Sequence, residues 1–138
     1  PLGWEAFLWS GTDPASRVTL VTAARSGQGA VALTGVGDKV NMGLQSQRRE
    51  AAAPPARAVA TVWYKAEPGS RPQLSVIAAG AGGDRVQYET SPVFAAASAW
   101  TRAVWELPLH QDARSIQLLL RNGAAGTVSF DDVELVVQ

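Results

Sequence analysis

Two adjacent carboxylates, Asp131 and Asp132, stand inside an apolar run near the end of the chain. Removing an ionised carboxylate from water is costly, so such a pair requires a strand edge, a β-bulge, a cationic partner or a bound ion. The flanking residues favour a bulge, because apolar side chains alternate onto one face before the pair, over residues 128–130, and onto the other face after it, over residues 133–137. One extra residue at the pair would restore the register.

The same pair is poorly suited to catalysis. A glycosidase needs two carboxyl groups on either side of a substrate, whereas successive side chains of a strand diverge. His110 is the only histidine and follows Pro108 and Leu109 at an expected strand end, which favours a surface or capping role over general-base chemistry. The chain has no cysteine and no nucleophile elbow, phosphate loop or zinc-ligand spacing. A non-catalytic protein is therefore expected, although nothing in the pattern selects or rejects a pair such as Glu89 with Glu106.

Length and charge restrict the remaining classes of protein. The 138 residues suit one domain with a single core, over residues 1–138. Twelve basic and twelve acidic residues give zero net charge, and the largest basic cluster is Arg48 with Arg49, so a surface that follows nucleic-acid phosphates is not expected. No apolar run approaches the roughly 18 residues of a membrane-spanning helix. The sequence therefore predicts neither a nucleic-acid partner nor a membrane span.

Short apolar runs separated by Gly, Pro, Asp and Asn clusters dominate the chain, and no long segment keeps the period of an amphipathic helix. The Ala/Pro-rich segment 50–55 is expected to cross between two sheets rather than to link two domains. The pattern predicts an all-β fold, an antiparallel β-sandwich of two sheets with little or no helix. Ten strands are expected, over residues 4–9, 17–23, 30–34, 40–46, 58–65, 73–79, 86–90, 101–108, 115–121 and 127–137.

Five short motifs follow one another in a recognisable order. They are Gly3, Trp4 and Glu5; Ser26 and Gly27 before Ala30, Ala32 and Leu33; Trp63, Tyr64 and Lys65; Trp100 and Thr101 with Pro108; and Phe130, Asp131, Asp132 and Val133. In this order and spacing the chain resembles carbohydrate-binding modules of the family 4/9 type, a jelly-roll sandwich within the galactose-binding-like fold. The resemblance covers nearly the whole chain and is more specific for the fold than for sugar binding.

The resemblance also implies a structural calcium ion. On the family's pattern Glu5 and Asp132 are the expected ligands, with Asp131 as a substitute and backbone carbonyls completing the shell. Calcium takes about six to eight oxygen ligands, which such a set could supply. The alternative is a metal-free edge, in which the Asp pair accepts backbone N–H bonds or an arginine.

Trp63 is the best candidate for a sugar-stacking platform. Alternation places Ala60, Val62 and Tyr64 toward the core on the family's pattern, which leaves Trp63 and Lys65 on the opposite face. Flat aromatic rings stack on the faces of sugars, and a few polar groups bond the hydroxyls. The alternative is that a crossing loop covers Trp63.

Polar side chains on other strands could complete the platform. Trp9, on a loop at the rim, is the second aromatic candidate, whereas Trp100 and Trp105 are expected in the core. A polar sheet face that merely contacts water is the competing interpretation. Parity on their strands places four polar candidates where they could flank Trp63, namely Gln87, Glu89, Gln117 and Arg121.

These observations lead to one functional expectation and one competitor. The chain is expected to be a non-catalytic carbohydrate-binding module that holds its parent, an extracytoplasmic polysaccharide-active or polysaccharide-handling protein such as a glycoside hydrolase, near a polysaccharide or oligosaccharide. Secreted, periplasmic and cell-surface locations would all fit. The competitor is a structural or protein-interaction sandwich without sugar binding, because aromatic residues make up only 7% of the chain.

Overall fold

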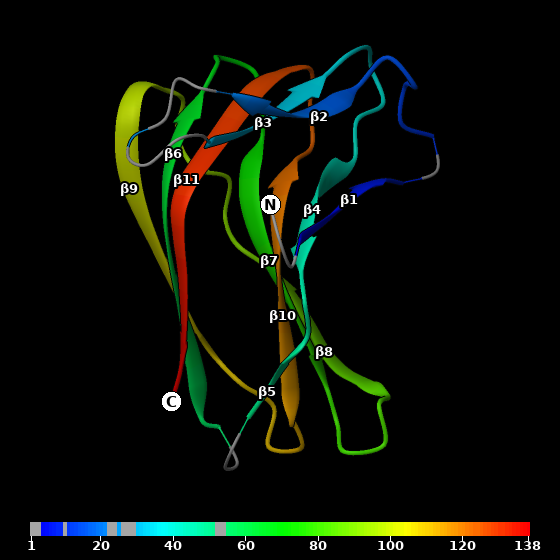
Figure 1. Cartoon of the computed structure of the whole chain (residues 1–138), viewed down its shortest axis with the longest axis vertical. Helices are drawn as coiled ribbons and strands as arrows, with labels where there is room; N and C mark the ends of the chain where they lie inside the picture. Colours follow the sequence, from blue (N-terminus) through cyan, green and yellow to red (C-terminus); the bar gives the residue numbers. More distant parts are fainter. Residues whose placement is uncertain (1–3, 10, 22–24, 26–29, 52–54) are drawn as a thin grey trace.

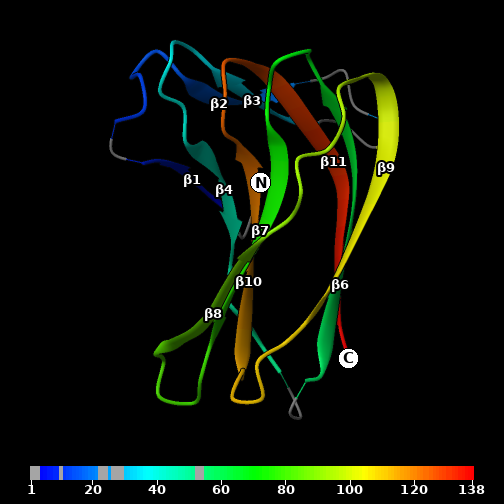
Figure 2. The same cartoon turned by 180° about the vertical axis from the view of Figure 1, so that it is seen from behind.

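The computed structural model describes residues 4–9, 11–21, 25, 30–51 and 55–138. These residues form two antiparallel β-sheets packed face to face (Figure 1), and the view from behind shows β9, β6 and β11 in one layer and β10, β7 and β8 in the other (Figure 2). The described part of the chain contains no helix, so none that could cross a membrane. The predicted all-β sandwich is confirmed.

We call the two layers sheet A and sheet B. Sheet A has the order β1 (Trp4–Leu8), β4 (Met42–Ser46), β10 (Ser115–Asn122), β7 (Pro72–Ala79) and β8 (Arg85–Thr90), and the short β5 (Arg49–Glu50) also pairs with β10. Sheet B has the order β2 (Arg17–Val21), β3 (Ala30–Gly35), β11 (Gly126–Val137), β6 (Arg57–Ala66) and β9 (Ala97–Pro108).

The core lies between the sheets and follows from period-2 alternation. Along β6, every second residue from Ala58 to Ala66 is buried, and the residues between them are half-buried on the outer side of sheet B. Sheet A contributes Leu74 and Val76 of β7 and the alternate residues of β10. Removing these side chains from water supplies the main stabilising term of the fold, at roughly 25 cal/mol per Å² of apolar surface.

The bulge predicted at the Asp pair is present. The register between β11 and β6 shifts between Asp131 and Glu134, and Asp132 has a φ of 49°, in the left-handed region. Phe130 is therefore fully buried before the shift, while Val133 packs against the same core after it. The bulge turns the carboxylates away from the core and keeps apolar side chains inside on both sides.

A buried asparagine ties the two sheets together at the end of β10. The Asn122 side chain is fully buried; its Nδ2 donates to the carbonyls of Leu33 (3.2 Å) and Gly126 (2.9 Å). Its Oδ1 accepts from the backbone N–H groups of Arg71 (3.1 Å) and Ala124 (3.2 Å). One side chain thus satisfies four backbone groups near the turn that leads into β11.

Most predicted strands occur, and two elements differ from the prediction. The pattern missed the two-residue β5, and β9 begins at Ala97, four residues before the predicted start at Thr101. The chain passes from sheet A to sheet B between β5 and β6, as expected for segment 50–55. The motif residues Gly3, Ser26 and Gly27 and the predicted end of the second strand lie outside the described residues.

Candidate functional site

Side chains of sheet A that point away from the core form one continuous surface, which we call the outer face of sheet A. The strand registers align these residues in rows that run across the sheet. One row contains Phe7, Gly43, Arg121 and Gln73. The adjacent row contains Glu5, Gln45, Leu119, Ser75 and Thr90. Leu119 and Ser75 have 0% exposure although they point outward, so longer side chains cover the middle of this face.

Arg121 organises that covering layer. Its Nη1 donates to Ser75 Oγ (3.1 Å) and Tyr88 Oη (3.0 Å), with Thr90 Oγ1 at 3.5 Å, and its Nη2 donates to Asn41 Oδ1 (2.6 Å). Burial lowers the pKa of the Arg121 guanidinium from its ordinary value, and the group stays charged at neutral pH. We call these five residues the arginine cluster. It joins side chains from β7, β8, β10 and the residue before β4.

Aromatic rings stand beside the arginine cluster. The Trp9 ring centroid lies 4.5 Å from Arg121 Cζ, and the Phe7 and Trp9 centroids are 4.4 Å apart. Backbone bonding fixes Trp9, because its N–H donates to the Asn41 carbonyl (2.9 Å). Tyr88 is 39% exposed on the edge strand. The outer face of sheet A thus combines polar side chains, a guanidinium and three aromatic rings.

Gly43 makes room for the Phe7 ring. A Cβ at this position would lie 2.7 Å from the ring's Cζ and 2.1 Å from the Leu120 carbonyl oxygen. We expect Gly43→Ala to destabilise the fold by about 1–3 kcal/mol, as overpacking does, and to change the near-UV circular dichroism of the Phe7 and Trp9 pair. Gly82→Ala is the matched control, because nothing lies within 4 Å of its Cβ position. Equal urea midpoints for the two variants would contradict the close packing of Phe7 on Gly43.

Trp63 lies on the opposite surface, the outer face of sheet B, under an arginine. Arg25 Cζ is 3.6 Å from the centroid of its ring. The Arg25 Nη1 forms an ion pair with Asp132 Oδ2 (2.7 Å), and the Arg25 backbone N–H donates to Asp131 Oδ2 (3.0 Å). This arrangement matches the alternative in which the Asp pair accepts an arginine and a backbone N–H. It also places a side chain over the proposed stacking surface of Trp63.

The residues expected to bind calcium do not come together as a ligand set. Glu5 Oε2 accepts from Gln45 Nε2 (3.3 Å) within sheet A, while Asp131 and Asp132 contact Arg25 on sheet B. No group of three or more His, Cys, Asp or Glu side chains that could hold a metal exists among the described residues. Glu5 and the Asp pair therefore do not share one site, and calcium binding by this chain stays a prediction.

We expect Arg25, rather than a metal, to hold the bulge of β11 in place. Arg25→Gln removes a half-exposed ion pair and a cation–π contact, so it should lower the free energy of unfolding by about 1–2 kcal/mol. Thermal melting of both proteins with calcium and with EGTA measures the effect. EGTA should leave the midpoint of the unsubstituted protein unchanged. A larger fall with EGTA than with Arg25→Gln would instead support a structural calcium ion.

The structure separates the predicted site residues into three groups. Arg121 and Trp9 are in contact, and Gln117 lies on the same face and donates to the Ser46 carbonyl (2.8 Å). Trp63 and Lys65 are on the outer face of sheet B. The expectation that Gln117 and Arg121 flank Trp63 is therefore wrong, because β10 belongs to the other sheet.

Glu89 and Gln87 form the third group and do not flank Trp63 either. They are paired across from Val76 and Ala78, which face the core, so their side chains leave β8 away from the outer face of sheet A. Gln87 braces the end of β9: its Nε2 donates to the Pro108 carbonyl (2.9 Å) and its Oε1 accepts from His110 N–H (2.8 Å). Parity predicted the wrong face because the pairing of β7 with β8 shifts between Ala78 and Ala79.

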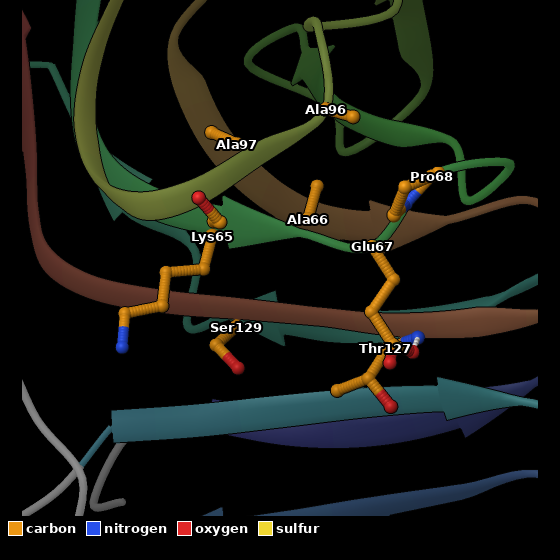
Figure 3. A pocket seen from close by; sticks show the side chains of 9 residues that line it. Lys65, Ala66, Glu67, Pro68, Ala96, Ala97, Thr127 and Ser129 are labelled. Atoms are coloured by element: carbon orange, nitrogen blue, oxygen red, sulfur yellow. Dashed lines mark hydrogen bonds between the residues drawn. The ribbon is translucent and has the colours of Figure 1, made fainter.

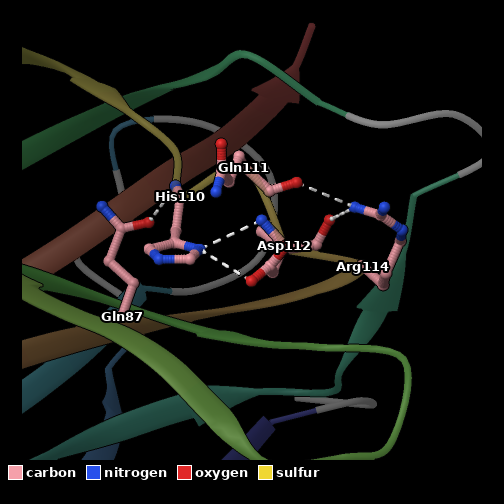
Figure 4. A network of polar contacts seen from close by, with 6 residues as sticks. Gln87, His110, Gln111, Asp112 and Arg114 are labelled. Carbon is pink, nitrogen blue, oxygen red and sulfur yellow. Dashed lines mark hydrogen bonds and ion pairs between the residues drawn. The ribbon is translucent and has the colours of Figure 1, made fainter.

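His110 has the capping role predicted for it. Its Nδ1 accepts a hydrogen bond from the Asp112 backbone N–H (3.0 Å) in the turn between β9 and β10 (Figure 4). Arg114 closes the same turn by donating to the carbonyls of Gln111 (3.2 Å) and Ala113 (2.7 Å). The ring therefore organises a turn.

The two tryptophans that were expected in the core lie in different surroundings. Trp105 packs against the core cluster, as predicted. Trp100 does not belong to that cluster, and Lys65 Nζ lies 4.9 Å from its ring centroid.

Near this pair is a hollow of about 620 Å³, in which Lys65, Ser129 and Thr127 stand below small apolar side chains (Figure 3). Its lining is completed by Ala66, Glu67, Pro68, Ala96, Ala97 and Ser98.

Sequence reasoning missed Tyr88 and the polar partners of Arg121. Ser75 and Thr90 share a hydrogen bond (2.8 Å) across β7 and β8, and both contact Arg121. One signal was present: Tyr88 and Thr90 alternate along one predicted strand, residues 86–90, so they share a face of it. The register needed to place them on one face is not contained in local alternation.

No family model and no curated protein sequence matches the chain. Among solved structures, the tailspike protein 4 enzymatically active domain of bacteriophage CBA120 has a TM-score of 0.80 at 10% identity and covers 99% of this chain. The CBM22-1 xylan-binding domain from Paenibacillus barcinonensis has a TM-score of 0.64 at 14% identity, with 98% of this chain and 85% of that chain covered. A CBM61 module in complex with β-1,4-galactotriose has a TM-score of 0.62 at 19% identity, with 99% and 90% covered.

These similarities establish the fold. The similar structures are mainly carbohydrate-binding modules, including members of families 22, 61, 16 and 4, so they do not single out the 4/9 type. The chain spans only 20% of the tailspike chain, and 26% of a Clostridium thermocellum xylanase chain that contains a CBM22-1 module. It spans most of the isolated modules and thus has the size of one such unit.

Proposed function

We propose that this chain is a non-catalytic carbohydrate-binding module whose glycan site is the outer face of sheet A. The observation that carries the proposal is the arginine cluster, in which a half-buried guanidinium and four neutral polar side chains, that of Tyr88 among them, meet beside Trp9. Sugar sites combine a few fixed polar groups with apolar rings, and this surface offers both. Its position on paired strands keeps the groups in fixed relative positions.

The size of the face suits a short oligosaccharide. Neighbouring strands lie about 4.8 Å apart, so the five strands from β1 to β8 span about 19 Å. Arg121 has five N–H donors, and its Nε–H and one Nη2–H have no partner among the described residues. These donors and the hydroxyl of Tyr88 would bond sugar hydroxyls, while the exposed Tyr88 ring and the Phe7 and Trp9 pair contact the apolar faces of the sugar.

The module would act by keeping a larger protein close to a polysaccharide. Of four structures with the same fold, one is described as xylan-binding and one as in complex with a galactotriose, and this chain covers only part of the other two, which are much longer chains. Tethering of this kind raises the effective concentration of the attached domains at the glycan without any chemistry in the module. An extracytoplasmic parent that acts on or handles polysaccharide would fit this role.

Affinity gel electrophoresis against a panel of soluble polysaccharides tests the proposal. We expect retarded migration with at least one glycan and no release of new reducing ends during prolonged incubation with it. Migration unaffected by every glycan would favour a structural or protein-interaction domain. Release of reducing ends would show that the chain is an enzyme.

A further inference from the structure

No carboxylate of the described residues forms an ion pair with Arg121. Among the described residues, the arginines that form an ion pair with a carboxylate are Arg25, with Asp132, and Arg57, with Glu106. The four groups that accept from Arg121 are hydroxyls and an amide oxygen, all neutral. A partly buried charge is usually paired, because neutral partners offset its desolvation only in part. Within the part of the chain that the structure describes, this cation is thus held by neutral groups alone.

The surroundings of Arg121 do not neutralise it from a distance. A second cation, Arg85, stands nearby with its Cζ 5.5 Å from the Tyr88 ring centroid. By register, Glu5 is two strands away and one row along, about 12 Å between Cα atoms, and its carboxylate is bonded to Gln45. Glu50 is paired with Ser115 at the other end of β10, about 20 Å away. Glu89 lies between Tyr88 and Thr90 in β8 but leaves that strand on the other side, so no acidic side chain of the described strands of sheet A points to the outer face next to Arg121.

We infer that the ligand of this face is an acidic glycan, whose uronic acid carboxylate pairs with Arg121. This inference rests on the proposed function and adds the class of sugar. A guanidinium presents planar N–H donors that match a carboxylate in a bidentate contact, and the Nε–H and one Nη2–H of Arg121 have no partner among the described residues. The neighbouring hydroxyls and rings suit the rest of the pyranose.

An ion pair between the partly buried Arg121 and a ligand carboxylate would be stronger than an ion pair exposed to water. Nη1 and Nη2 are already held by Ser75, Tyr88 and Asn41, so little side-chain freedom is lost when a ligand binds. Burial lowers the pKa of the Arg121 guanidinium because it removes water from the charged group. A carboxylate ligand would offset this cost of desolvation. A neutral sugar could accept the same hydrogen bonds but could not balance the charge.

Chemically matched polysaccharides test the inference on the whole chain. Polygalacturonate, glucuronoxylan and alginate are each compared with the same polymer after reduction of its carboxyl groups, together with neutral xylan and galactan. Dissociation constants are measured by isothermal titration calorimetry at low and high sodium chloride. We expect at least one acidic polymer to bind. Reduction of its carboxyl groups should lower the affinity at least tenfold, and high salt should weaken the binding.

The outcomes separate this inference from the proposed function. Equal binding of an acidic polymer and its reduced form, or preference for neutral xylan or galactan, would overturn the acidic ligand and leave a neutral glycan-binding module. Binding to none of the polymers would overturn the proposed function itself. Arg121→Lys keeps the charge but loses the planar array of N–H donors. It should therefore lower the affinity for the acidic polymer several-fold and keep part of the salt dependence. A variant that binds like the unsubstituted protein would show that Arg121 does not pair with the carboxylate.

Discussion

Arg121→Gln is expected to lower glycan affinity by about 100-fold, which corresponds to about 2.7 kcal/mol. The substitution removes a charge and the donors that hold Ser75, Tyr88 and Asn41 in one arrangement. Central residues of this kind commonly contribute 2 kcal/mol or more to binding. The measurement is calorimetric titration with the glycan that the unsubstituted protein binds best. Arg102→Gln is the matched control, because Arg102 is an exposed arginine on β9 of the other sheet.

The fold of the Arg121→Gln variant should survive. Tyr88 and Asn41 are at least partly exposed, so water can replace the lost donors at their oxygens, and the buried Ser75 Oγ keeps its hydrogen bond to Thr90 Oγ1. Circular dichroism and the urea midpoint establish this before binding is compared. A folded Arg121→Gln variant that binds as well as Arg102→Gln would place the glycan elsewhere.

Asn122→Ala is expected to produce the largest loss of stability, about 3 kcal/mol or more. The substitution removes both donors to Leu33 and Gly126 and the acceptor of two backbone N–H groups, at a position with 0% exposure. Each buried backbone group left without a partner costs about 1–3 kcal/mol, and water entering the space would offset part of the sum. Urea unfolding, analysed for both midpoint and slope, measures the change.

Gln111→Ala provides the control for Asn122→Ala. Gln111 is exposed in the turn between β9 and β10, so its removal should change the free energy of unfolding by less than about 0.5 kcal/mol. If Asn122→Ala were tolerated to the same degree, the buried asparagine would not be what joins the end of β10 to β3.

Features set by local alternation could be predicted from the sequence. The inward face of β6 from Ala58 to Tyr64 follows from period-2 patterning, and the same reasoning located the bulge at Asp131 and Asp132. Turn residues between the apolar runs gave most strand ends. The arginine alternative for the carboxylate pair was also open from electrostatics alone, since a charge at such a position needs a partner.

Features set by pairing between distant strands could not be predicted from the sequence. Trp63 and Arg121 each face outward on their own strands, but only the strand order shows that β6 and β10 belong to opposite sheets. Arg25 and Asp132 are 107 positions apart, so their ion pair leaves no local signal. Gln87 and Glu89 were assigned to the wrong face because a register shift between β7 and β8 reverses the parity of that strand.

The central claim is that the glycan site lies on sheet A and not around Trp63, and one paired measurement tests it directly. Tyr88→Ala and Trp63→Ala are titrated with the same glycan under the same conditions, after both are shown to be folded. We predict that Tyr88→Ala loses at least tenfold in affinity, since it removes the most exposed ring beside Arg121, while Trp63→Ala stays within about threefold of the unsubstituted protein. Loss of binding in Trp63→Ala with full binding in Tyr88→Ala would contradict the account.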